Sequence, residues 1–157
     1  MAAAAFDTRG IVVTCPSCAQ KNRLAYDRLA DAVRCGKCKE TLRPPAEPLD
    51  VSSAAEFDQL IAGAAVPVVV DYWAPWCGPC RMVAPEVAKV ASRRAGRALV
   101  VKVNTDEVPE LGDRFGIRSI PTLAVFAGGH EVTRFVGARP AEEIERLVDQ
   151  AATPSKI

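Results

Sequence analysis

The stretch "VPVVVDYWA" at residues 66–74 limits the fold more than any other part of this chain. It is a nearly continuous run of β-branched and aromatic residues, with almost no alternation between apolar and polar positions. A strand that is apolar on both sides is typical of a parallel sheet whose two faces are covered by helices. The run therefore predicts a central, buried strand in an α/β domain.

The segments around this strand alternate between helical and strand patterns. Ser53 and Glu56 fit a capping box that starts a helix, and Pro85 is expected to kink a later helix. Alternation followed by a hairpin predicts a mixed sheet with helices on both faces. The expected elements are a helix after Ser53, the strand at 66–74, a helical pattern of Met82, Val83, Val87, Val90 and Ala91, a strand at 98–103, a short helix around 107–115, a strand up to Gly128-Gly129, a strand from His130, and a last helix from Pro140 with Ile144, Leu147 and Val148 on one face.

Charge and length exclude some classes of protein. The 157-residue chain has 20 Lys and Arg and 19 Asp and Glu, and this net charge of +1 gives no global attraction to nucleic acid or to membranes. The start, "MAAAAFDTRG", lacks the basic leader and long apolar run of a signal peptide, and no apolar run is long enough to span a membrane. We therefore expect a cytoplasmic protein, in which six cysteines indicate metal binding or redox catalysis.

Two of the three Cys-x-x-Cys pairs form a pattern typical of a zinc site. Cys15, Cys18, Cys35 and Cys38 have the spacing C-x2-C-x16-C-x2-C, in which each pair delivers two sulfurs to one side of a tetrahedral metal. Four thiolates leave no open coordination position, so we expect one structural Zn2+. The alternative is two pairs of reactive or incidental thiols in a flexible tail.

A proline-rich segment separates this cysteine-rich unit from the rest of the chain. The sequence "RPPAEP" at residues 43–48 is expected to be stiff and extended. We therefore expect a zinc-ribbon unit at residues 1–42, a linker at 43–49 and an α/β domain at 50–157.

The third pair, Cys77 and Cys80 in "WCGPC", lies where the buried strand meets a helix. A helix N-terminus has positive potential and free N–H groups, which favour the thiolate of the first cysteine. We expect Cys77 to be exposed and to attack a substrate disulfide, and the more shielded Cys80 to resolve the mixed disulfide. The alternative, another metal knuckle, lacks ligands because the only histidine, His130, belongs to the predicted hairpin.

Three further residues are candidates for catalysis. Asp71 interrupts the apolar strand, and burial there would raise its pKa into a range that suits a proton carrier. Lys102, inside "VVKV", is expected to approach Asp71 from a neighbouring strand. Pro121, in "SIPT", fits either an edge position or a cis peptide. For Asp71 and Lys102 the alternative is that both are polar strand positions facing solvent.

Several separated stretches together resemble the thioredoxin family. They are "VDYWAPWCGPC", "VKVN", "FGIRSIPT" and the "FVGA" that follows Gly128-Gly129, and the resemblance covers residues 50–152. With the four-cysteine unit in front, the chain is similar to bacterial zinc-ribbon thioredoxins of the thioredoxin 2 type. The resemblance implies a thioredoxin fold, which is a mixed central sheet flanked by helices, with a small N-terminal zinc ribbon.

The resemblance also implies roles for individual residues. Cys77 would be the nucleophile, Cys80 the resolving thiol, and Asp71 the buried acid/base that Lys102 modulates. Pro121 would be a cis-proline facing the disulfide. The remaining residues would form an apolar surface on which substrates dock: Trp76, Gly78, Pro79, Ile120, Val136 and Gly137.

The family pattern further implies the direction of the reaction. Trp73 would pack beneath the active-site loop, and Tyr72 replaces a Phe that is common in the family. Gly78-Pro79 between the cysteines is typical of reductants, so the resemblance implies a monomeric protein-disulfide reductase with thioredoxin reductase as partner and no organic cofactor. Two alternatives are a disulfide isomerase or oxidase, and a ribbon module that binds nucleic acid or protein beside a redox-inactive domain.

Overall fold

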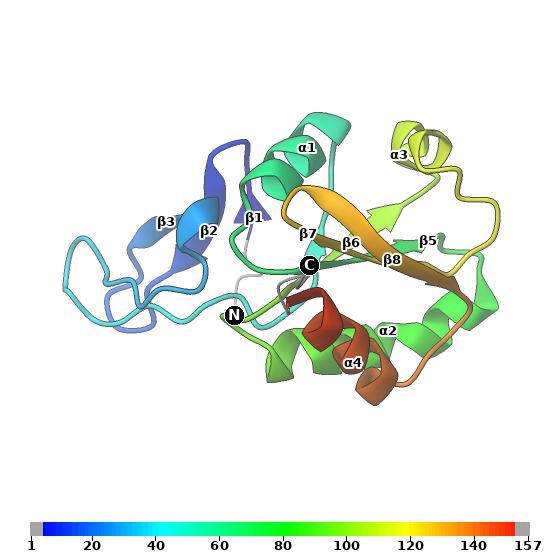
Figure 1. Ribbon diagram of the computed structural model, residues 1–157. Coiled ribbons are helices and arrows are strands. Elements are labelled where there is room, and N and C mark those ends of the chain that lie inside the picture. Colours follow the sequence, from blue (N-terminus) through cyan, green and yellow to red (C-terminus); the bar gives the residue numbers. More distant parts are fainter. Residues whose placement is uncertain (1–4, 153–157) are drawn as a thin grey trace.

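The computed structural model describes residues 5–152, which form a five-stranded mixed sheet with helices on both faces and a smaller three-stranded sheet beside it (Figure 1). In the large sheet the strand order is β4-β6-β5-β7-β8. The strands β4, β6 and β5 are parallel, whereas β7 and β8 are antiparallel to their neighbours. The strands are β4 (Leu49–Asp50), β5 (Val68–Trp73), β6 (Leu99–Asn104), β7 (Thr122–Ala127) and β8 (His130–Val136). The expected mixed sheet and hairpin are confirmed.

The predicted buried strand is β5, at the centre of this sheet. It pairs with β6 on one side and β7 on the other, and its first five residues are buried. Val68, Val70 and Tyr72 belong to the apolar core on one face of the sheet. Val69 belongs to the core on the opposite face. Both faces of β5 are therefore covered, which explains why its sequence shows no polar alternation.

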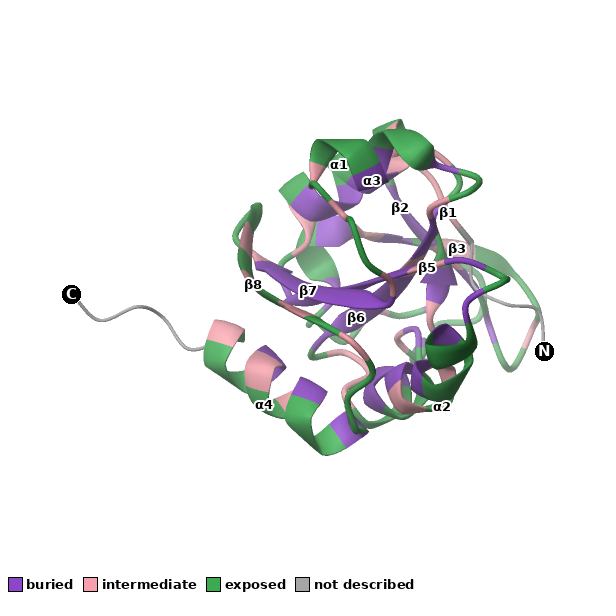
Figure 2. Cartoon of the chain, turned by 90° about the vertical axis from the view of Figure 1, so that its right-hand side faces the viewer, coloured by how far each residue is buried: buried purple, intermediate pink, exposed green. Residues whose placement is uncertain are grey.

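Two helices cover each face (Figure 2). Apolar residues of α1 and α3 pack on the face that includes Tyr72, and those of α2 and α4 pack on the face that includes Val69. The side chain of Ser53 caps α1 by accepting a hydrogen bond of 3.2 Å from the Glu56 N–H, as predicted. The helices are α1 (Ala54–Gly63), α2 (Gly78–Arg93), α3 (Pro109–Arg114) and α4 (Ala141–Ala152).

Met82 does not belong to the buried side of α2, although the sequence pattern predicted that it would. Val83 and Val87 are completely buried, but Met82 is 70% exposed. Successive helical residues are rotated by about 100°, so Met82 lies beside the stripe that Val83 and Val87 form. The helix continues through Pro85.

The unit that contains the four N-terminal cysteines includes a small antiparallel sheet, whose strands the sequence did not predict. The order is β1-β2-β3, and a short 3-10 helix η1 follows β3. We call residues 5–42 the ribbon. Its elements are β1 (Ala5–Phe6), β2 (Gly10–Thr14), β3 (Lys21–Ala25) and η1 (Tyr26–Arg28).

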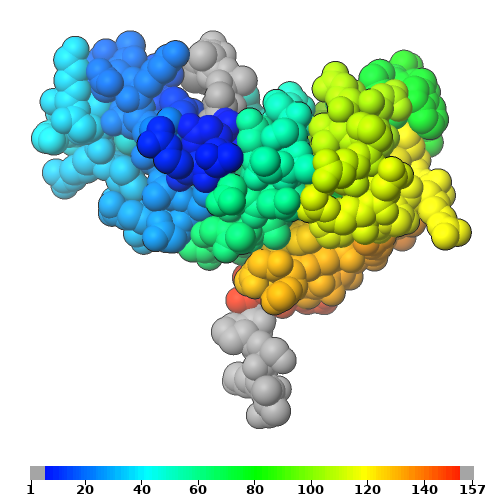
Figure 3. Space-filling model, turned by 90° about the horizontal axis from the view of Figure 1, so that it is seen from above, coloured from blue at the N-terminus to red at the C-terminus, as the bar shows by residue number. Residues whose placement is uncertain are grey.

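The ribbon packs directly on the large domain instead of standing apart from it (Figure 3). The Tyr26 carbonyl oxygen accepts a 3.0 Å hydrogen bond from Ala65 N–H, just after α1. Gly63 allows the end of α1 to approach Tyr26 closely, because a Cβ built on residue 63 would lie only 3.1 Å from Tyr26 Cβ. One continuous core contains residues of both units: Ile11, Leu24, Tyr26, Leu29 and Leu42 from the ribbon with Phe57, Leu60, Ile61 and Val66 from the large domain.

The expected linker is also engaged with the rest of the protein. Pro45 is buried, and Leu49, at the end of the expected linker, lies in β4 and pairs with Val101. Residues 1–4 and 153–157 lie outside the described residues. The predicted starts of the zinc-ribbon unit and of the signal-peptide comparison, and the predicted end of the α/β domain, therefore fall outside them. Among the helices that the structure describes, none is long and apolar enough to cross a membrane.

The buried hydroxyl of Tyr72 is an unfavourable feature of the core that a substitution can test. Its side chain is fully buried, and within residues 5–152 its hydroxyl has no hydrogen-bond partner. A buried hydroxyl without a partner costs about 1–3 kcal/mol. We therefore expect Tyr72→Phe to raise the free energy of unfolding by about 1 kcal/mol, because Phe keeps the ring that packs on Phe115. Urea unfolding with an unchanged m-value measures this difference.

Tyr26 provides the matched control for this substitution. It is also buried, but its hydroxyl donates a hydrogen bond to the Asp7 carbonyl oxygen. The same chemical change, Tyr26→Phe, should therefore lower the free energy of unfolding by about 1 kcal/mol. A loss of stability in both variants would show that the Tyr72 hydroxyl is satisfied in solution.

Candidate active site and metal centre

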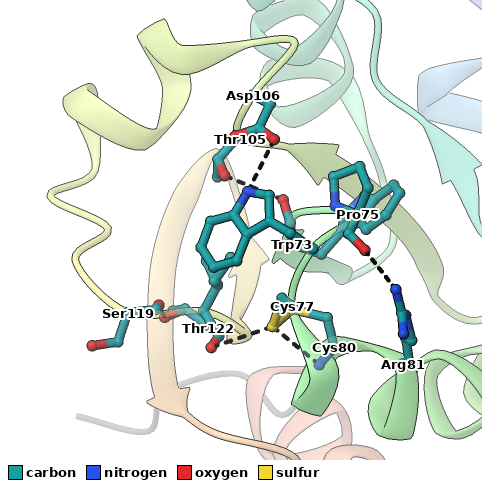
Figure 4. Close-up of a disulfide and its surroundings, with 11 residues drawn as sticks. Trp73, Pro75, Cys77, Cys80, Arg81, Thr105, Asp106, Ser119 and Thr122 are labelled. Carbon is teal, nitrogen blue, oxygen red and sulfur yellow. Dashed lines mark hydrogen bonds between the residues drawn. A yellow bond between two sulfur atoms is a disulfide. The ribbon is translucent and has the colours of Figure 1, made fainter.

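Cys77 and Cys80 form a disulfide at the junction of β5 and α2 (Figure 4). The chain leaves the end of β5 at Trp73, turns through Pro75, and enters α2 at Gly78. Because the turn is short, both cysteines lie at the helix N-terminus, with their Cα atoms 5.3 Å apart. Open α/β sheets bind ligands and place reactive groups at this end of a central strand.

Cys77 is itself the N-cap of α2. Its Sγ accepts a hydrogen bond of 3.2 Å from the backbone N–H of Cys80. In the reduced protein this N–H and the positive end of the helix stabilise negative charge on Cys77, which lowers the cost of forming its thiolate. Pro79 has no N–H to donate, but in the first helical turn that loss is small.

The structure corrects the expectation that Cys77 is the more exposed thiol. In the disulfide both cysteines are 4% exposed. Cys77 Sγ lies 3.7 Å from the carbonyl oxygen of Ile120, so the segment before β7 covers part of the sulfur. The two cysteines differ in their hydrogen bonding and not in their exposure.

The expected docking residues come together around this disulfide. The Ile120-Pro121 peptide is cis, as the resemblance implied, and the Pro121 carbonyl oxygen accepts a 2.8 Å hydrogen bond from Gly137 N–H. Trp76 is 69% exposed and Val136 is 56% exposed. Gly78 and Pro79 are exposed in the first turn of α2, and Ile120 is half-buried. Large apolar side chains left in water at such a site suit contact with a protein partner.

Two residues at this surface escaped sequence reasoning. Asp106 accepts a 3.1 Å hydrogen bond from the indole Nε1–H of Trp76, and so fixes the ring of an otherwise exposed side chain. Met82 lies two residues after Cys80 and adds exposed apolar area. A carboxylate in a loop has no sequence signal for this role, and Met82 was hidden by the helical pattern around it.

Asp71 is buried in β5 at 1% exposure. Among the described residues neither of its carboxylate oxygens has a hydrogen-bond partner. Burial raises its pKa to about 7, and the positive charge of Lys102 opposes this rise. A carboxyl group that titrates near neutral pH can both accept and return a proton under ordinary conditions.

Lys102 is the direct neighbour of Asp71 on the adjacent strand β6. Its ammonium does not form an ion pair with Asp71 within the described residues; Nζ lies over the ring of Trp73, 4.5 Å from the centroid. The solvent-facing alternative for Asp71 is therefore wrong, because its carboxyl is buried. Lys102 is partly buried and acts on Asp71 through its charge.

The other four cysteines gather at one end of the ribbon. Their Sγ atoms all lie within 4.8 Å of one another, with Cys15 3.5 Å from Cys38 and Cys18 3.6 Å from Cys35. Four sulfurs placed about 2.3 Å from a tetrahedral zinc would be separated by about 3.8 Å. The donor set and its spacing therefore fit a zinc ion.

Hydrogen bonds favour the thiolate form at Cys35, one of the four candidate ligands. Hydrogen bonds from the backbone N–H of Cys38 and from the Asn22 side chain, opposed by desolvation, lower the pKa of Cys35 to about 6. Asn22 is a further residue that sequence reasoning missed, since it lies in a polar strand 13 residues before the cysteine it contacts.

Comparison with known proteins identifies the family. Residues 48–150 match the family described as Thioredoxin. This chain belongs to the thioredoxin family. Residues 14–40 match a second family, described as Thioredoxin 2, N-terminal, which corresponds to the ribbon. The thioredoxin fold with an N-terminal zinc ribbon, expected from the resemblance, is confirmed, and the chain is a thiol-disulfide oxidoreductase of the protein-disulfide-reductase class.

Individual thioredoxins show how far the similarity extends. Thioredoxin C-3 from Corynebacterium nephridii is 37% identical over 140 residues, which cover 89% of this chain and 94% of that protein. Thioredoxin 1 from a Nostoc species is 51% identical over 94 residues, or 60% of this chain and 88% of the relative. The structure of a mutant thioredoxin from Halobacterium salinarum superposes with a TM-score of 0.65 at 33% identity, covering 72% of this chain and 97% of that chain.

Proposed function

We propose that the chain reduces disulfides of other proteins, with Cys77 as nucleophile and Cys80 as resolving thiol. The observation that carries this assignment is the hydrogen bond from Cys80 N–H to Cys77 Sγ at the N-terminus of α2. It stabilises negative charge on Cys77 alone, and a thiolate is the form that attacks a disulfide.

The proposed reaction has two steps. The Cys77 thiolate attacks one sulfur of a substrate disulfide, a mixed disulfide forms, and the other substrate sulfur leaves as a thiolate that takes a proton from water. Cys80 then gives its proton to the Asp71 carboxylate and attacks Cys77 Sγ, which releases the second substrate thiolate and forms the Cys77–Cys80 disulfide. Two electrons pass from the dithiol to the substrate.

Asp71 is suited to the second step by its position and its pKa. Tyr72 faces the side of the sheet covered by α1, so its neighbour Asp71 points to the side covered by α2, whose first turn contains Cys80. In its ionised form, above a pKa of about 7, the carboxylate is a base of suitable strength for a thiol proton. Lys102 assists by limiting the rise of that pKa.

The exposed apolar residues around the disulfide form the proposed docking surface. Trp76 and Val136 provide most of its exposed apolar area, and Ile120 and Gly137 extend it. We further propose that the protein acts as a cytoplasmic monomer and that thioredoxin reductase returns it to the dithiol form.

Reduction of insulin disulfides, followed by turbidity with dithiothreitol as electron donor, tests this function. We expect the parent protein to accelerate precipitation of the insulin B chain and Cys77→Ser to give the rate of dithiothreitol alone. Equal rates with and without the parent protein would refute the reductase proposal.

We also propose that the ribbon holds one structural zinc through Cys15, Cys18, Cys35 and Cys38. With four sulfur ligands the metal has no open position for a substrate, so its role is to fix the two knuckles of the ribbon. Such a site contributes directly to folding, since the ribbon alone has few apolar residues to bury.

Metal analysis checks the zinc site. The parent protein is expected to contain close to one zinc per chain, and Cys15→Ser to lose most of it because three thiolates bind far more weakly than four. Cys77→Ser is the matched control, since it removes a cysteine outside the cluster and should retain the metal. Undiminished zinc in the Cys15→Ser protein would contradict the assignment.

A further inference from the structure

The two cysteine knuckles of the ribbon have nearly the same backbone. In the first, Cys15 N–H donates to Gln20 O at 2.9 Å and Ala19 N–H donates to Cys15 O at 3.0 Å. In the second, Cys35 N–H donates to the Glu40 carbonyl and Lys39 N–H to the Cys35 carbonyl, at 2.8 and 3.0 Å. Ala19 and Lys39 have matching positive φ values of 64° and 65°. The backbone therefore treats the two halves of the site alike.

One side chain breaks this symmetry. Asn22, on β3, donates from Nδ2 to the Gln20 carbonyl oxygen at 3.0 Å and to Cys35 Sγ at 3.5 Å. Its Oδ1 accepts a hydrogen bond of 3.0 Å from Gly36 N–H. At the equivalent place in the second half, two residues after Glu40, stands Leu42, which is buried and apolar. Asn22 thus contacts both knuckles, and no described residue plays the matching part from the other side.

Each of these contacts has a consequence for a bound metal. The contact with Gln20 ties Asn22 to the loop that closes the first knuckle, and the contact with Gly36 ties it to the turn of the second. The third contact offers an N–H to a thiolate sulfur, which stabilises negative charge on that ligand and fixes its direction. The three contacts together need an NH2 donor and a carbonyl acceptor on one short side chain, and among side chains of this size only asparagine has both.

We propose that Asn22 is a positioning residue of the metal centre, which sets the two knuckles at the separation zinc requires and orients Cys35 as a ligand. The proposal rests on the zinc site proposed above. Partners that orient metal ligands typically change metal affinity by about 10- to 100-fold when they are removed.

Zinc competition against a chromogenic chelator tests this role on the full-length chain. We expect Asn22→Ala to bind zinc about 10- to 100-fold more weakly than the parent. Asn22→Asp keeps the shape and the acceptor for Gly36 but loses both donated bonds and places a negative charge beside the thiolates. It should therefore bind zinc at least as weakly as Asn22→Ala. Gln20→Ala is the control, because among the described residues the Gln20 side chain hydrogen-bonds to the Lys21 carbonyl and not to either knuckle, and its zinc affinity should equal that of the parent.

Cobalt substitution adds a readout that overall stability does not move. Removing the N–H donor makes the Cys35 thiolate easier to oxidise, so the sulfur-to-cobalt charge-transfer band of both Asn22 variants should shift to longer wavelength. Zinc affinities within twofold of the parent for both variants, with an unchanged cobalt spectrum, would overturn the proposal. A parent protein that binds no zinc would instead refute the metal site itself, and the two failures are thereby distinguished.

Discussion

Cys80→Ser will accumulate as a covalent complex with its substrate, joined through Cys77, and its steady-state reduction of insulin will fall to the rate of dithiothreitol alone. Cys77 keeps its place at the N-terminus of α2, so it still forms a thiolate and attacks. The hydroxyl that the variant carries in place of the Cys80 thiol cannot displace the substrate, so the mixed disulfide persists. Mass spectrometry of the trapped species under non-reducing conditions identifies the linked cysteine.

The converse variant provides the control for this experiment. Cys77→Ser retains Cys80, which is buried in the first turn of α2 and has no comparable N–H donor within the described residues. It should trap little or no substrate. Adducts found mainly on Cys80 in the Cys77→Ser protein, with none on Cys77 in the Cys80→Ser protein, would reverse the two roles.

Asp71→Asn should slow disulfide turnover by about a hundredfold at pH 8, where the parent carboxylate is ionised and accepts the Cys80 proton. The size of the effect should depend on pH in a defined direction. As pH falls through the Asp71 pKa of about 7, the parent loses its base and approaches the slow variant. The pH–rate profiles of both proteins measure this difference. Parent rates in the variant at every pH from acidic to alkaline would show that Asp71 carries no proton.

The same substitution should increase stability, again with a specific pH dependence. The pKa of Asp71 is about 7 in the folded state, whereas its reference value, which we take for the unfolded state, is 3.8. Burying the ionised carboxylate therefore costs about 4 kcal/mol. This penalty is absent below the unfolded pKa, grows as pH rises toward 7, and is complete above it. Asp71→Asn should therefore be more stable than the parent at pH 8, and the difference in free energy of unfolding should shrink toward pH 4.

The sequence was most informative where one physical constraint acted on many neighbouring residues. The run at 66–74 has almost no polar position because β5 is covered on both faces, so its burial was predictable. The cysteine spacing at 15–38 indicated a metal site because two short turns must each deliver two sulfurs. Asp71 was a candidate because it is a single acid in an apolar strand, although the sequence left open that it faces solvent.

Other features depend on contacts that no local pattern records. The two-residue strand β4 is too short to show periodicity, and β3 is mostly polar because one side of the ribbon faces water. The bond from Trp76 to Asp106 spans 30 residues, and the position of Asn22 between the knuckles requires three partners. The greater exposure expected for Cys77 failed because the covering segment, at Ile120, is 43 residues away.

The core shared by the ribbon and α1 couples the proposed zinc site to the stability of the whole folding unit. Elements that bury their apolar side chains against each other tend to unfold in one cooperative transition, so metal binding at the ribbon adds to the free energy of unfolding of the disulfide-exchange domain as well. That contribution grows with the logarithm of the free zinc concentration. The stability of the protein would in this way depend on the supply of zinc, although its disulfide chemistry takes place at the end of β5 that leads into α2.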